Sequence, residues 1–169
     1  MVDGHGARVH ETHELACQPG CTACCRQDLA VTVVEADAVF AWVREHGAAP
    51  QSASRTEVDD HSRFEELAYG EACAFLGEAG LCTVYEVRPI ICRTHGLPLQ
   101  IEAEVSVCPL SLPLDPSPTV LDLAGLNLRL ALIAQLYEAG EGLGAHEGRV
   151  PLSEVRRSAL GDGPPSWYL

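Results

Sequence analysis

The feature that most constrains this chain is the segment CQPGCTACC, residues 17–25, which places four cysteines within nine positions. They are Cys17, Cys21, Cys24 and Cys25, in the spacing C-x3-C-x2-C-C. Short loops between thiols bring several sulfurs within reach of one ion, and structural zinc uses four such ligands at ~2.3 Å. Iron–sulfur clusters are also held by closely spaced cysteine thiolates. The spacing therefore predicts a metal site.

Four more cysteines follow, and they are Cys73, Cys82, Cys92 and Cys108. All eight lie at expected turns, hairpin ends or strand ends, whereas a cysteine that merely packs as a small apolar residue belongs on the apolar face of a helix or strand. We therefore predict all eight as ligands of one metal site built from distant segments. For a single cysteine a packed free thiol is the alternative, and for the set it is disulfide or redox exchange.

The compartment decides between metal and disulfide. The first residues, MVDGHGARVHETHELA, contain no apolar stretch of signal-peptide length. The most apolar segment, 120–139, carries Asp122 and Arg129, so we interpret it as a buried helix and not as a membrane span. We expect a cytoplasmic protein, in which thiols stay reduced and a cysteine pattern indicates metal binding or catalysis.

Charge and size exclude some classes of function. The formal net charge of -13 argues against nucleic acid and against anionic membranes, since both require clustered basic residues. The 169 residues, 47% of them hydrophobic, are enough for one domain with its own core, so disulfides are not needed to hold it together.

The pattern of the chain predicts a single α+β domain with short strands, a hairpin and several helices. The predicted elements are a strand at 29–34, helices at 35–46 and 57–68, a hairpin at 73–85, a short helix from Pro89, a half-buried strand at 100–107 and a helix at 120–139. We expect residues 1–14 to be mobile, residues 15–140 to form the cysteine-cluster domain, and residues 141–169 to form a tail packed on its surface. The 120–139 helix is apolar on most sides, so it is either central to the fold or half of a dimer interface.

The adjacent pair Cys24–Cys25 suggests more than one ion. Neighbouring side chains usually diverge, so the pair is expected to serve two neighbouring metals or to supply a bridging thiolate. Cys92 falls in the first turn of the helix from Pro89, where backbone N–H groups are expected to stabilise a thiolate. The arginines that could offset the thiolate charge are Arg26, Arg88 and Arg93.

The two cysteine blocks, together with CAFL and LCTVYEVRPIICR, resemble the YkgJ-type cysteine-cluster proteins, described as zinc- or iron-chelating domains with a CxxCxxCC signature. The resemblance covers about residues 15–108. It implies metal-ligand roles for the cysteines of both blocks, which are Cys17, Cys21, Cys24, Cys25, Cys73, Cys82, Cys92 and Cys108. This chain departs from the signature by having three residues, not two, between Cys17 and Cys21.

We considered three functions for these residues, of which two fit. The first is a protein that holds zinc or iron and acts as a carrier, sensor or partner module, with metal binding coupled to folding. The second is an iron–sulfur redox protein or an accessory component of a modification enzyme. A radical S-adenosylmethionine enzyme is disfavoured because no repeated strand–helix units are apparent.

Outside the cysteines, the sequence offers few candidate functional groups. No hydrolase triad, phosphate-binding glycine loop or HExxH motif stands out, and whether the chain is an enzyme stays open. His95, three residues past Cys92, is a further candidate ligand, although a lone histidine is more often a surface or hydrogen-bonded group. Besides the metal ion, a protein partner or a second copy could bind through the 120–139 helix.

Overall fold

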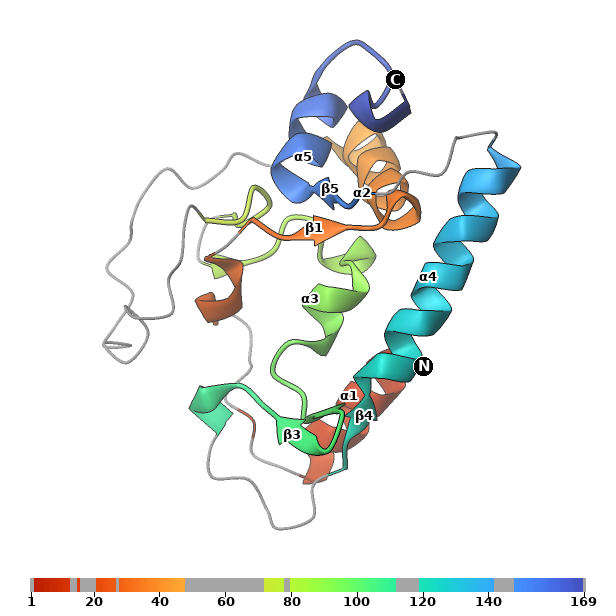
Figure 1. Ribbon diagram of the computed structural model, residues 1–169. Helices are drawn as coiled ribbons and strands as arrows, with labels where there is room; N and C mark the ends of the chain where they lie inside the picture. The colour runs from red at the N-terminus through yellow and green to blue at the C-terminus, as the bar shows by residue number, and fades with distance from the viewer. Residues whose placement is uncertain are drawn as a thin grey trace.

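The computed structural model describes residues 2–12, 15, 21–26, 28–47, 72–77, 80–111, 119–141 and 148–168 (Figure 1). Within these residues the chain is an α+β protein with two small sheets, as predicted. The helices are α1 Val2–Thr12, α2 Val33–His46, α3 Ile90–Thr94, α4 Leu123–Gly140 and α5 Leu152–Leu160. The strands are β1 Ala30–Val31, β2 Leu99–Ile101, β3 Glu104–Ser106, β4 Leu121–Asp122 and β5 Val150–Pro151. Short 3-10 turns are η1 Ala23–Cys25, η3 Tyr85–Val87, η4 Pro109–Ser111 and η5 Ser166–Tyr168.

The core lies between α2 and α5, near the upper part of Figure 1. Helix α5 buries Leu152, Val155 and Ala159, which recur at helical spacing and so form one apolar face. This face packs against the buried valines of α2, and β5 pairs antiparallel with β1 beside it. The expectation that residues 141–169 lie over the surface was therefore wrong, because their described part supplies one side of the core.

The helix predicted at 35–46 is confirmed as α2. It begins slightly earlier because Thr32 and Glu35 form a capping box, in which each residue satisfies a backbone N–H at the helix start. It ends at Gly47, whose φ of 77° favours glycine. The predicted strand at 29–34 is shortened to β1 because the helix takes its last residues.

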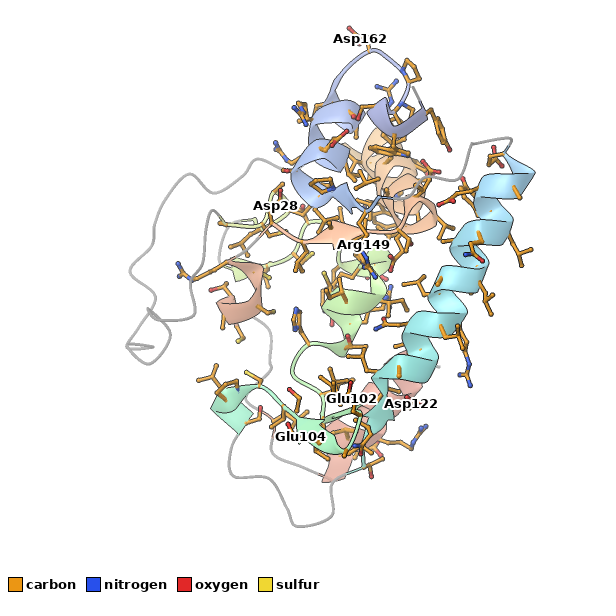
Figure 2. All side chains as sticks on the ribbon, viewed as in Figure 1. Asp28, Glu102, Glu104, Asp122, Arg149 and Asp162 are labelled. Carbon is orange, nitrogen blue, oxygen red and sulfur yellow. The ribbon has the colours of Figure 1, made fainter. Side chains whose placement is uncertain are left out.

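The segment 100–107, predicted as one half-buried strand, forms the antiparallel hairpin β2–β3, and the prediction was wrong on both points. Glu102 turns the chain with a φ of 53°, and the side-chain amide of Gln100 donates to the carbonyl oxygens of Glu102 and Glu104. Strand β3 is exposed throughout. Alternation of polar and apolar residues is the same in one strand as in two strands joined by a two-residue turn, so the pattern missed the turn. Figure 2 shows Glu102 and Glu104 on this hairpin, beside Asp122 at the start of α4.

The N-terminal residues, expected to be mobile, form helix α1 and pack against α3. Val9 is fully buried. Gly6 lies next to the Leu97 side chain, and a Cβ atom at this position would be in ordinary van der Waals contact with it. This contact with the rest of the fold explains why a segment that looks polar in sequence is helical.

Helix α4 is also different from its expectation. It begins at Leu123 and not at residue 120, because Asp122 caps it: the Asp122 carboxylate accepts from the backbone N–H of Gly125 at 2.9 Å. The helix was expected to be buried, yet the side chains of Leu128, Leu132 and Leu136 are 63%, 52% and 75% exposed. Among the described helices, none has the length and apolar character needed to cross a bilayer. The helix predicted at 57–68 lies outside the described residues.

The C-terminal contribution to the core can be measured directly. Trp167 is 6% exposed, and its indole N–H donates to the Asp37 carboxylate at 2.8 Å. We expect Trp167→Ala to lower the free energy of unfolding by about 3–5 kcal/mol through loss of burial and creation of a cavity. Leu160→Ala, at a 55% exposed position, should stay within about 0.5 kcal/mol of wild type. Urea denaturation tests both, and equal small losses would show that residues 141–169 only cover the surface.

Candidate metal centre

Five cysteines from three segments lie close enough beside the core for their charges to affect one another's pKa. Turn η1 contributes Cys24 and Cys25, the following hairpin contributes Cys73 and Cys82, and α3 contributes Cys92. The Cys73 N–H donates to the Cys25 carbonyl oxygen at 2.7 Å, which links η1 directly to the hairpin. The charges of Cys24, Cys73 and Cys82 each raise the pKa of Cys92, so the five thiols share one electrostatic environment.

The hairpin predicted at 73–85 is confirmed in its described residues. Leu76 and Cys82 form an antiparallel bridge, and the Thr83 N–H donates to the Phe75 carbonyl oxygen at 2.9 Å. Phe75, 2% exposed, anchors the hairpin in the core. As a result, Cys73 and Cys82 are held near each other on a segment that cannot move without disturbing the core.

The adjacent cysteines form a hydrogen-bonded pair. The bond from the Cys25 thiol lowers the pKa of Cys24 to about 7, because it stabilises the Cys24 thiolate. The same bond, together with burial, raises the pKa of Cys25. Cys25 therefore keeps its proton at neutral pH, while Cys24 is the thiol of the pair that ionises more easily. The two side chains do not diverge as we expected, because the tight η1 turn brings them into contact.

Burial has the largest effect on the pKa of the other three thiols. It raises the pKa of Cys73 and of Cys82, although backbone N–H groups of Phe75 and Val84 partly oppose it. It also raises the pKa of Cys92 to about 12. Our expectation that the start of α3 would stabilise a Cys92 thiolate was wrong, since a five-residue helix does not outweigh the loss of water around the sulfur.

Arg88 places a positive charge near three of the thiols. Its positive charge lowers the pKa of Cys24, Cys82 and Cys92. The guanidinium lies 3.6 Å from the centre of the Tyr85 ring, and Nε donates to the Tyr85 carbonyl oxygen at 3.2 Å, so its position is fixed from two sides.

The other two predicted arginines behave differently. Arg93 donates to the carbonyl oxygens of Arg88 and Glu86, each at 2.7 Å, and so supports the backbone that carries Arg88. Arg26 is exposed.

Glu35 connects this region to α2, and sequence reasoning did not foresee that connection. One carboxylate oxygen accepts from the N–H and hydroxyl of Thr32 at 3.0 and 2.8 Å, and the other accepts from the Ile90 N–H at 2.8 Å. One side chain thus caps α2 and α3 together and fixes the helix that carries Cys92. The Thr-x-x-Glu spacing was a readable signal for the first cap, but nothing local signals the second.

Asp28 connects η1 to α5 in a similar way. Its carboxylate accepts from the Ser153 N–H at 3.1 Å and from the Ser153 hydroxyl, and Figure 2 shows Asp28 below α5. Its negative charge raises the pKa of Cys73. The segment that leaves the first cysteine block is therefore tied to the second half of the core.

The comparisons with known proteins can now be set beside this geometry. A family model described as "CxxCxxCC: Putative zinc- or iron-chelating domain" matches residues 16–109, more than half of the chain. The chain belongs to this family. The predicted resemblance is confirmed, and the match includes both cysteine blocks. No curated protein and no solved structure matches the chain.

The CxxCxxCC assignment supports metal binding. The cysteine side chains are suitable ligands, because cysteine thiolates bind both zinc and iron. The arrangement of those donors is less complete. Over the described part of the chain, no three His, Cys, Asp or Glu side chains are arranged so that they could hold a metal ion. Binding by the neighbouring thiols therefore requires their sulfurs to turn toward a common point.

The remaining predicted ligands lie outside the group of five thiols. Cys17 lies outside the described residues. Cys21, just before η1, and Cys108, after β3, are both half-buried, and their ligand role rests on the sequence alone. His95 follows α3, and burial lowers its pKa, which keeps the ring neutral as a metal ligand requires.

The role of Glu35 in this CxxCxxCC chain can be tested by substitution. We expect Glu35→Ala to lower the free energy of unfolding by about 2–4 kcal/mol, since it removes three hydrogen bonds to a carboxylate at two helix starts. Glu45→Ala, on the exposed end of α2, should change it by less than about 0.5 kcal/mol. Urea denaturation measures both. Similar losses in the two variants would contradict the double cap.

The raised thiol pKa values predict how the stability of the metal-free protein depends on pH. Folding raises the pKa of Cys92 from 9.0 to about 12. The resulting contribution to the free energy of unfolding is fully present below pH 9.0 and is lost as pH rises through the folded pKa. All 11 basic residues are arginine, so lysine titration does not interfere in this range. We therefore expect the urea midpoint, measured with chelator and reductant, to fall as pH rises from 9.0 toward 12.

The control for this effect is Cys92→Ala, which lacks one of the buried thiols. Its midpoint should fall less steeply than that of wild type over the same pH range, although tyrosines contribute equally to both. Identical slopes would mean that the Cys92 thiol does not resist ionisation in the folded state.

Proposed function

We propose that this chain binds zinc or iron through Cys24, Cys25, Cys73, Cys82 and Cys92. The observation that supports the proposal is their shared, largely buried environment, in which the charges of Cys24, Cys73 and Cys82 raise the pKa of the neighbouring thiols. Gathering such groups without a cation costs free energy, since several thiolates would repel one another in a region of low polarity. A divalent cation removes that cost and releases the protons.

We further propose that the site is polynuclear. Five neighbouring thiols exceed the four ligands of a tetrahedral zinc ion. In this proposal Cys17, Cys21 and Cys108 are the additional ligands that complete the second ion.

The proposed biological role is that of a carrier, sensor or partner module in the cytoplasm, where thiols remain reduced. Metal would connect η1, the hairpin and α3, three segments that are joined within the protein by few backbone hydrogen bonds such as Cys73 N–H to Cys25 O. Loss of metal would therefore loosen this side of the fold and weaken the part of the core that Phe75 of the hairpin fills.

A second candidate is an iron–sulfur centre in a redox protein or in an accessory component of a modification enzyme. The observation that favours it is the same excess of thiols, because a cluster uses several cysteine thiolates around more than one iron. The two candidates differ in colour and in sulfide content.

The deciding experiment is anaerobic purification followed by elemental analysis, a visible spectrum and acid-labile sulfide determination. Stoichiometric zinc in a colourless protein supports the first candidate, as does iron without sulfide. Iron with sulfide and broad visible absorption supports the second. A folded protein without stoichiometric metal would overturn both.

Single substitutions then test the ligands. We expect Cys24→Ser and Cys92→Ser each to lower bound metal per chain and the melting temperature together, because a hydroxyl replaces a thiolate ligand. Gln135→Ala, on the exposed face of α4, is the matched control and should retain both values. Unchanged metal content in a cysteine variant would remove that residue from the proposed site.

A further inference from the structure

Helix α4 presents an apolar surface on the side that faces away from the rest of the protein. Three leucines, Leu128, Leu132 and Leu136, are 63%, 52% and 75% exposed and recur every fourth residue. The small residues Ala124, Ala131 and Ala139 are exposed beside them. These six residues are called the outer stripe. Figure 1 shows α4 along one edge of the molecule, with α2 and α3 on its inner side.

The charges of α4 are arranged opposite to those of an ordinary surface helix. Its acidic residue, Glu138, is 9% exposed, whereas the leucines face solvent. Arg129 is the charged residue of α4 that is exposed, and it borders the outer stripe, one position from Leu128 and three from Leu132. An amphipathic surface helix has the reverse pattern, so the outer stripe has the composition of an interface.

We propose that the outer stripe is the contact surface for a second copy of this chain, with the two α4 helices antiparallel and centred on Leu132. This inference does not depend on the metal proposal. The leucines are symmetric about Leu132, so a two-fold axis there places Leu128 of one copy against Leu136 of the other, and the reverse pair forms at the same time. The alanines then allow close approach of the two helices.

The net charge disfavours an anionic membrane as the occupant and restricts where a second copy can bind. Each chain carries -13, so two copies repel each other over most of their surfaces. The outer stripe contains no charged residue, which makes it the part of α4 where two copies can meet without bringing like charges together. An anionic membrane is disfavoured by the same net charge and by the single exposed arginine on this helix.

The size of the contact sets its strength. An 18-residue helix is about 27 Å long, so one pair of helices gives an interface near the lower limit for specific association, roughly 1,000 Å². We therefore expect a dimer with micromolar or weaker affinity. Because like charges lie outside the contact, salt should strengthen it by screening their repulsion.

The test is analytical ultracentrifugation of the full-length, metal-loaded protein over a wide concentration range. Wild type should shift toward twice the monomer mass as concentration rises, and more so at high salt. Leu132→Glu should remain monomeric, because the symmetric contact places two carboxylates together. Leu160→Glu, at an exposed leucine outside α4, should dimerise like wild type.

A charge pair then tests the register. Leu128→Lys alone should weaken dimerisation, whereas Leu128→Lys combined with Leu136→Glu should restore it, since each lysine faces a glutamate of the other copy. Circular dichroism and metal content, both expected to be unchanged, separate this result from misfolding or loss of metal. A wild type that stays monomeric at the highest concentration, or a Leu132→Glu variant that still dimerises, would overturn the proposal.

Discussion

The mutual repulsion and burial of the cysteine thiols form the constraint on which this side of the protein depends. Cys25, Cys73, Cys82 and Cys92 all have raised pKa values, chiefly because burial or a neighbouring thiol disfavours the charged form. Among these five described thiols, only Cys24 has a lowered pKa, and the hydrogen bond from Cys25 is the main cause. Without a metal the group is therefore mostly protonated. A divalent cation would exchange those protons for ligand bonds, which couples the charge of the site to its shape.

Two carboxylates connect the segments that carry these thiols to the core. Glu35 caps α2 and α3 with a single side chain, and Asp28 joins the end of the first cysteine block to α5. Arg88 contributes the opposing positive charge, held over Tyr85 and supported by Arg93. The thiols are thus positioned by polar contacts to the α2–α5 core rather than by a sheet or a long helix of their own.

Local signals in the sequence were sufficient for several elements. Helix α2, the hairpin between Cys73 and Cys82 and the short helix after Pro89 all depend on contacts within a few residues, and all were predicted. The failures share a different cause. Helix α1 depends on a contact with α3, and α5 depends on the apolar face of α2, so neither could be recognised from its own segment. The turn at Glu102 interrupts a strand pattern without glycine or asparagine, and alternation alone does not reveal it.

The sequence by itself determined the family and the available donors, because cysteine spacing is a property of the chain and needs no folding to be read. Only the tertiary structure decided which thiols become neighbours, which of them holds its proton and which arginine opposes their charge. Those properties depend on burial and on groups that are distant along the chain, such as Asp28 beside Cys73. The exposed side of α4 was decided in the same way, since an almost entirely apolar helix does not show in its sequence which face the rest of the protein will cover.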